Sequence, residues 1–69
     1  MDRKEVKSSY LKSVGYENGT LEIEFINGAV FEYYSIPASL HAELVQAESP
    51  GRFFIDNIKD VSYAFARVS

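Results

Sequence analysis

Two similar turn motifs constrain the fold of this chain more than any other feature of its sequence. Asn-Gly occurs at residues 18–19 and again at 27–28, each time two residues after an aromatic residue and just before a small one. Asn and Gly tolerate the left-handed backbone that tight hairpin turns require. The flanking segments alternate apolar and polar residues, as half-buried strands do. The pattern therefore predicts a three-stranded antiparallel meander.

The side chains around the second turn favour one register of this hairpin. A three-residue loop at 26–28, with its glycine in the left-handed region, would pair Ile23 with Phe31 and Leu21 with Tyr33. One face of the hairpin then becomes wholly apolar. A two-residue loop would instead turn a glutamate into the core, so we expect the three-residue loop.

The first turn leaves two registers open. A three-residue loop, which we favour, would pair Leu11 with Phe25. A two-residue loop would instead turn Val14 and Tyr16 inward, and a bulge at Gly15 would let both sets of side chains contribute to the core.

The residues after the meander predict a helix that begins near Pro37. Proline suits the first position of a helix, and the residue before it avoids helical geometry. Leu40, Leu44 and Ala47 then recur at helical spacing, so the helix can lay one apolar stripe on the sheet.

A second short helix is expected after the break at Ser49-Pro50-Gly51. Ser49 would cap it, Pro50 would occupy its first position, and Lys59 would lie in its last turn. The alternation over 61–68 indicates a short final strand. The predicted fold class is thus α+β, a three-stranded antiparallel meander packed against two helices with a short C-terminal strand, in a single domain over residues 1–69. The predicted core consists of Leu21, Ile23, Phe25, Phe31, Tyr33, Leu44, Phe54 and Ile58, joined by Phe65.

Composition limits the classes of function. Ten acidic residues against seven basic ones give a net charge of −3, so the molecule as a whole repels polyanions. The chain has no cysteine, which excludes disulfides and thiolate metal sites. It has no apolar stretch of the kind found in signal peptides or membrane spans. We therefore expect a cytoplasmic location and no membrane partner.

Several segments together resemble a known family. They are Ser8-Ser9-x-Leu11-x-Ser13-Val14-Gly15-Tyr16, Leu21-x-Ile23-x-Phe25-x-x-Gly28, Ile36-Pro37, Ala47-x-Ser49-x-Gly51-x-Phe53-Phe54 with Ile58-Lys59, and Arg67-Val68. In this pattern, which covers nearly the whole length, the chain resembles the KTSC domain, found at the C-terminus of some lysyl-tRNA synthetases and as a stand-alone bacterial protein. It departs from the family at Phe31, where a tyrosine is usual, and at Ile55, where an asparagine is usual. The resemblance implies no known activity, and RNA binding is suggested by the synthetase association alone.

The aromatic residues outside the predicted core are candidates for stacking on RNA bases. In the favoured registers three tyrosines lie on the outer face of the sheet, which is where sheet-based RNA readers stack bases. With two nearby lysines they form the candidate nucleic-acid-binding set: Lys7, Tyr10, Lys12, Tyr16 and Tyr34. Glu22, Glu24 and Glu32 share that face and would repel phosphate.

No group of residues indicates catalysis, a metal site or a cofactor. His41 is the single histidine, and no serine has an evident base partner. Arg52, Lys59 and Arg67 could bind an anion if the fold brought them together. We expect a non-catalytic binding module whose partner is single-stranded RNA or a ribonucleoprotein. The alternative is a protein-interaction module or homo-oligomer that binds no nucleic acid.

Overall fold

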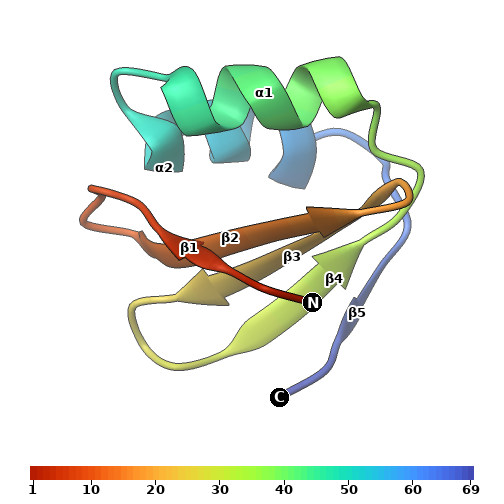
Figure 1. The fold of residues 1–69 in the computed structure, drawn as a ribbon, viewed down its shortest axis with the longest axis horizontal. Helices are drawn as coiled ribbons and strands as arrows, with labels where there is room; N and C mark the ends of the chain where they lie inside the picture. Colours follow the sequence, from red (N-terminus) through yellow and green to blue (C-terminus); the bar gives the residue numbers. More distant parts are fainter.

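A five-stranded antiparallel sheet forms one layer of the molecule, and two helical segments form the other. The computed structural model describes residues 1–69, and Figure 1 shows both helical segments on the same side of the sheet. The elements in chain order are β1 (Lys4–Glu5), β2 (Leu11–Glu17), β3 (Thr20–Phe25), β4 (Val30–Tyr33), α1 (Ala38–Gln46), α2 (Pro50–Phe54), η1 (Ile55–Lys59) and β5 (Phe65–Arg67). The strands lie in the order β1-β2-β3-β4-β5. The predicted α+β class and antiparallel meander are confirmed, but three strands were too few.

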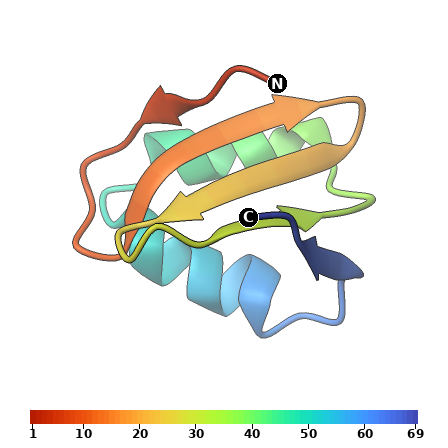
Figure 2. The same cartoon turned by 90° about the horizontal axis from the view of Figure 1, so that it is seen from below.

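The two additional strands lie at the two edges of the sheet (Figure 2). β5 is the predicted C-terminal strand, shorter than expected, and it pairs with β4. β1 was missed because it has only two residues, both exposed, and so carries no alternation of apolar and polar residues.

The second hairpin has the predicted register. Ile23 lies opposite Phe31 and Leu21 opposite Tyr33. The amide of Gly28 donates to the carbonyl of Phe25 over 2.9 Å. The φ angle of Gly28 is +92°, the left-handed backbone that the three-residue loop requires.

The favoured three-residue loop of the first hairpin was wrong, although its pairing of Leu11 with Phe25 is confirmed. The turn is the two-residue alternative, with φ of 50° at Asn18 and 83° at Gly19, as in a type I′ turn. A bulge does let both sets of side chains face inward, but it lies at Lys12 between Leu11 and Ser13 rather than at Gly15. The bulge resets the alternation of the strand. Leu11 therefore stays opposite Phe25 while Val14, further along the strand, also joins the core.

Both predicted helices form. Pro37 immediately precedes α1, and Pro50 is the first residue of α2. The predicted cap was wrong, because the side chain of Ser49 makes no capping hydrogen bond to α2. α2 continues into η1, a π-helix in which the amide of Asp60 donates to the carbonyl of Ile55 over 3.0 Å. Lys59 lies in the last turn of η1, as predicted.

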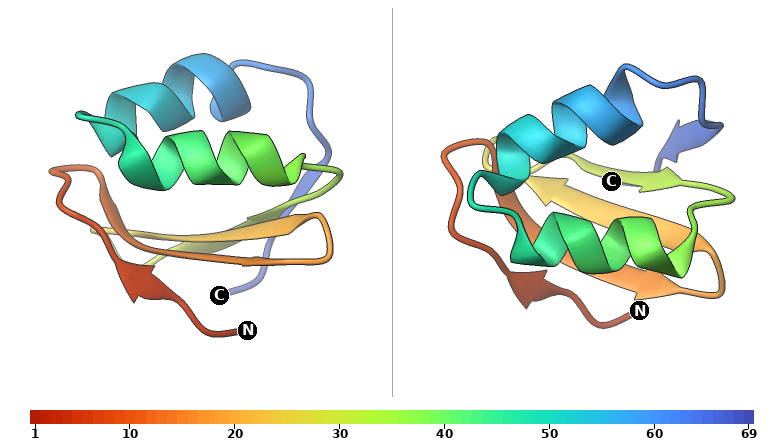
Figure 3. Two further views of the ribbon diagram at one scale, coloured as in Figure 1. Left: turned by 45° about the horizontal axis from the view of Figure 1, so that its top comes forward. Right: turned by 90° about the horizontal axis from the view of Figure 1, so that it is seen from above.

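The core lies between the helical segments and the sheet. Its ten residues are Leu11, Val14, Leu21, Ile23, Phe25, Tyr33, Ile36, Leu44, Phe54 and Ile58, with Phe31 partly buried against them. Phe65, expected in the core, is 61% exposed. It belongs to the edge strand β5, which the helices leave uncovered (Figure 3). None of the helices has the length and apolar character that crossing a bilayer requires.

Candidate functional site

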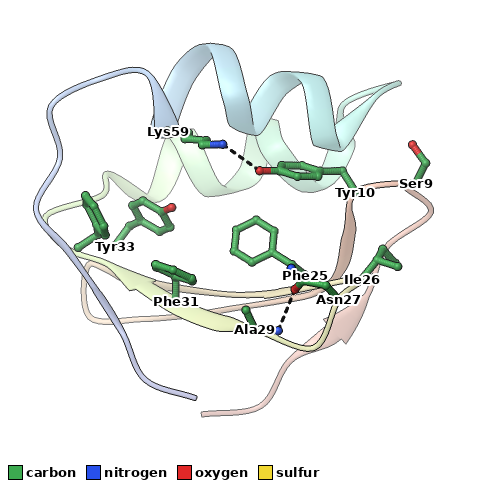
Figure 4. Close-up of a pocket in the computed structure, with 10 residues that line it drawn as sticks. Ser9, Tyr10, Phe25, Ile26, Asn27, Ala29, Phe31, Tyr33 and Lys59 are labelled. Atoms are coloured by element: carbon green, nitrogen blue, oxygen red, sulfur yellow. Dashed lines mark hydrogen bonds between the residues drawn. The ribbon is translucent and has the colours of Figure 1, made fainter.

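An aromatic groove opens between η1 and the helix-facing side of the sheet, over β4 and β5 (Figure 4). It encloses about 590 Å³. Its aromatic lining consists of Tyr10, Phe25, Phe31, Tyr33 and Phe65; the other lining residues are Ser9, Ile26, Asn27, Ala29 and Lys59. We call this cavity the aromatic groove. It is the one feature of the molecule with the size and apolar lining typical of a ligand site.

The aromatic rings of the groove contact one another in order along its floor. Phe25 meets Phe31 edge to face, with centroids 5.7 Å apart and planes at 82°. Phe65 lies 5.5 Å from Tyr33 and 6.1 Å from Phe31. Phe25 and Tyr33 are almost fully buried, whereas Phe31 is half-buried and Phe65 is exposed. Free aromatic surface is therefore concentrated at the β5 end of the groove.

A single charge lies in the groove. Among the ten lining residues only Lys59 is ionisable near neutral pH, and its Nζ donates to the hydroxyl of Tyr10 over 3.1 Å. No carboxylate lies within ion-pair distance of Lys59, in contrast to Arg3 and Arg52. An ammonium group has three donors, so two remain for a ligand.

The side chain of Tyr10 is held in the groove by a tight local structure. The Oγ of Ser8 accepts hydrogen bonds from the amides of Tyr10 and Leu11, over 3.0 and 3.1 Å. This turn interrupts the extended backbone just before β2. A Cβ on Gly51 would lie 2.9 Å from Ser8 Oγ and 3.0 Å from Tyr10 Cβ, so α2 approaches the turn more closely than another residue would allow.

Tyr33 closes the inner part of the groove as a neutral phenol. Burial, with a smaller contribution from the nearby Tyr10, raises the pKa of Tyr33. The hydroxyl thus stays protonated across the physiological range. It offers a ligand hydrogen bonding without charge.

The structure does not bring the predicted nucleic-acid-binding residues together. Tyr10 lies in the aromatic groove, on the helix side, and its predicted place on the outer face was wrong. Tyr16 was also misplaced: its ring stacks on His41 of α1 at 4.7 Å, and its hydroxyl donates to the carbonyl of Ile36. The bulge at Lys12 turns Tyr16 inward, and the turn held by Ser8 does the same for Tyr10.

The other three members of the predicted set remain outside the groove. Lys12 is exposed beside the outer-face glutamates, and Tyr34 donates to a carboxylate oxygen of Glu32 over 3.2 Å. That bond, together with burial as the larger cause, raises the pKa of Tyr34. Lys7 lies on the loop between β1 and β2, next to the start of α2. Of these three side chains only Lys7 lines a hollow together with Tyr10, and none of them lines the aromatic groove.

The outer face of the sheet is acidic and partly covered. Glu22 lies directly opposite Glu32, as predicted, and Arg3 reaches over the sheet to Glu22 at 3.2 Å and Glu24 at 3.9 Å. The absence of a side chain at Gly15 permits this arrangement, because a Cβ there would lie 2.8 Å from the carbonyl oxygen of Asp2. Stacking of bases on this face would require displacing the N-terminal segment.

Arg52, Lys59 and Arg67 do not converge on an anion site. Arg52 pairs with Asp56 over 3.1 Å within its own helix, and Arg67 Nε donates to the carbonyl of Ser69. Only Lys59 lines the aromatic groove. No group of three or more His, Cys, Asp or Glu side chains is placed to hold a metal ion.

Sequence reasoning missed the groove for an identifiable reason. Four of the aromatic residues that line it, Phe25, Phe31, Tyr33 and Phe65, were assigned to the core on size and alternation, and size does not show which of them the helices leave uncovered. The last strand did carry a usable signal for an uncovered aromatic ring. Phe65 and the charged Arg67 lie only two residues apart, in a segment that is too short to be covered on both sides.

Comparison with known proteins identifies the family. The KTSC domain family model matches residues 7–63. An uncharacterized protein from Stutzerimonas stutzeri is 37% identical over 99% of both chains. A lysine–tRNA ligase from Nostoc punctiforme is 40% identical over 77% of this chain, but the match spans only 10% of the ligase.

The fold comparison agrees. The crystal structure of a KTSC domain protein from Yersinia pestis matches with a TM-score of 0.86 at 32% identity, over 99% of this chain and 97% of that one. Three residues of the matching motifs have a structural role in this chain. Ser8 forms the turn before β2, and Gly15 and Gly51 allow close packing. By sequence, by fold and by these motif residues, the chain belongs to the KTSC domain family.

Proposed function

We propose that this chain is a small non-catalytic module that binds single-stranded RNA, weakly, through the aromatic groove. The observation that carries the proposal is an aromatic cavity whose only charged lining residue is Lys59. Proteins that bind single strands combine aromatic rings, on which bases stack, with cations that contact the backbone. The groove supplies both, and no carboxylate lines it to repel phosphate.

The family context supports the same class of ligand. Relatives named lysine–tRNA ligases contain a similar segment over about a tenth of their length. A domain joined to an enzyme of tRNA is well placed to bind RNA. Association of this kind supports a ligand class, whereas the binding residues must come from the site itself.

The net charge of −3 limits the strength of binding. Few phosphates can be neutralised, so most of the affinity must come from stacking, which contributes about 1–3 kcal/mol per base. The binding residues we propose are Tyr10, Phe31, Phe65 and Lys59. Of the set predicted from the sequence, only Tyr10 is retained.

A direct titration tests the proposal. We would titrate fluorescent single-stranded RNA against the parent, Phe65→Ala and the matched outer-face variant Tyr34→Ala, at low salt. Loss of one stacked base at about 1–3 kcal/mol corresponds to roughly 5- to 150-fold weaker binding for Phe65→Ala. Tyr34→Ala should bind like the parent. Absence of binding by the parent at tens of micromolar, or equal losses in both variants, would contradict the proposal.

The exposed edge of β5 favours a second candidate, a protein-interaction module. In an antiparallel pair alternate residues bond the neighbouring strand, and here Ala64 and Val68 bond β4, which leaves the backbone groups of Phe65 and Arg67 directed off the sheet. Such an edge can accept a strand from a partner or from a second copy. Partners retained in a pull-down after nuclease treatment, or a Phe65-dependent dimer in sedimentation, would favour this candidate over RNA binding.

A further inference from the structure

We infer that the aromatic groove is a single-nucleotide site, in which one base lies among the rings and its phosphate contacts Lys59, so that a nucleoside monophosphate is a sufficient ligand. The inference rests on the proposed function and makes it more specific. It follows from the charge, the shape and the polar side chains of the groove.

The charge of the groove calls for one anionic group. Lys59 is the only charged lining residue, has no ion-pair partner and donates to the Tyr10 hydroxyl. An ammonium group held in this way binds phosphate as a point charge. Because the net charge of the chain is −3, this local cation is also what would draw an anion to the groove.

The shape of the groove suits one flat ring system. Its volume of about 590 Å³ is within the range of sites that hold one small ligand. Phe31 is half-buried and Phe65 is 61% exposed, and their ring centroids are 6.1 Å apart. A base seated at this end of the groove can contact both rings, while the buried Phe25 and Tyr33 support them from below.

Two polar side chains lie in the part of the groove away from β5. Figure 4 shows Ser9 beyond Tyr10 as seen from Lys59, and Asn27 across the groove from Lys59, beside Phe25 and Ala29. The side-chain oxygen of Asn27 accepts from the amide of Ala29 over 3.0 Å, so its NH₂ group is left free to donate. These groups add hydrogen-bonding capacity to the rings and the one cation of the groove, as is usual in sites for small polar ligands.

The surroundings limit the site to one nucleotide. Arg52 is engaged by Asp56, and Arg67 Nε is bonded to the carbonyl of Ser69. On the other side of the sheet lie the outer-face glutamates and Arg3, which pairs with two of them. Lys7 lines a separate hollow that shares Ser9 and Tyr10 with the groove, so a second phosphate would meet no further cation in the groove itself.

The experiment compares ligands of increasing size on the intact chain. Adenosine and uridine 5′-monophosphates, their nucleosides, inorganic phosphate and RNA oligomers of two to ten nucleotides would be titrated by NMR. We expect the monophosphates to shift the amides of Phe31, Tyr33 and Phe65 and to displace the oligomers. The nucleosides should bind more weakly, and inorganic phosphate should cause no comparable shift. The salt dependence should correspond to about one phosphate, a slope near −0.7 for a single strand.

Two matched variants locate the phosphate. Lys59→Gln should weaken binding of the monophosphates about tenfold or more and bring their affinity close to that of the nucleosides. Arg52→Gln, which removes an exposed cation outside the groove, should change it less than twofold. Thermal melts of both variants check that each remains folded.

The outcomes separate the inference from the proposed function. If oligomers bind with the predicted dependence on Phe65 but monophosphates fail to displace them, the single-nucleotide site is wrong and RNA binding stands. If Lys59→Gln and Arg52→Gln weaken binding equally, the assignment of the phosphate to Lys59 is wrong. If neither oligomers nor monophosphates bind, both the inference and the proposed function fail.

Discussion

The two faces of the sheet carry different chemistry. The helix-facing side is aromatic and apolar, and it remains open where β4 and β5 extend beyond the helices. The outer side is acidic and bears no helix, and the N-terminal segment runs along its β2 edge, from which Arg3 pairs with Glu22 (Figure 2). Free aromatic surface is thus found on the side that also forms the core, and the side first expected to bind RNA is the acidic one. In so small a domain, incomplete cover of the core is a simple way to create a binding site.

Replacing one phenylalanine at each end of the groove gives the largest test of this comparison. Phe25, 9% exposed and in contact with Tyr10, Phe31 and Phe54, belongs to the core as well as to the groove. Phe25→Ala should lower the free energy of unfolding by about 3–5 kcal/mol. Phe65→Ala, the same substitution at a ring that is 61% exposed, should cost under about 1 kcal/mol while weakening ligand binding.

Urea denaturation of both variants measures the difference. Similar losses of stability would show that the groove has no separate buried floor and exposed rim. A Phe25→Ala protein that melts within a few degrees of the parent would contradict the register of the second hairpin.

Gly15 tests the outer face. Gly15→Ala brings a Cβ to 2.8 Å from the carbonyl oxygen of Asp2, so the N-terminal segment must shift or leave. We expect a loss of about 1–3 kcal/mol and faster amide exchange at the residues where β1 pairs with Val14. Lys12→Ala, an exposed position on the same strand, is the control. Unchanged exchange in Gly15→Ala would show that the segment is not packed on this face.

His41 tests the part of the helix-facing side that α1 covers, where its ring stacks on Tyr16. Burial lowers the pKa of His41, so between the unfolded and the folded pKa the unfolded chain binds more protons. Stability should therefore fall as the pH decreases from about 6.5 through the folded pKa. His41→Phe, which keeps an aromatic ring against Tyr16, should reduce this part of the pH dependence. An identical pH profile in the variant would assign the loss to other groups.

The smallest expected effect concerns the pair of glutamates on the outer face. Glu22 and Glu32 lie directly opposite each other on neighbouring strands, and only Glu22 is paired with Arg3. Glu32→Gln should stabilise the fold by a few tenths of a kcal/mol through relief of like-charge repulsion. Glu48→Gln is the control, an exposed acid away from the sheet. Thermal melts at low and high salt should show that the gain in Glu32→Gln diminishes with screening.

Much of the fold could be predicted from local sequence, because turns and alternation are local. The loop at Gly28, the start of α1 after Pro37 and seven of the ten core residues follow from such signals. The first hairpin could not be settled in this way, since a bulge at Lys12 makes both registers partly correct. β1 forms only because β2 offers it a partner, and nothing in its two residues indicates a strand.

The candidate site was less predictable for a different reason. A groove forms where the helices leave part of the sheet uncovered. This depends on how the two layers pack and not on any one segment. Tyr10 illustrates this: its place beside Lys59 depends on a turn held by Ser8 and on contact with Gly51, distant in sequence. Alternation alone placed it on the wrong side of the sheet.

The position of the two chain ends has a consequence for how the domain can be used. Both termini lie on the side of the sheet away from the helices (Figure 1), whereas the aromatic groove opens on the helix side. A polypeptide extending from either end would leave from the opposite side and need not obstruct the groove. The fold is therefore suited to serve as an appendage on larger proteins, with the aromatic groove facing outward from the protein to which it is joined.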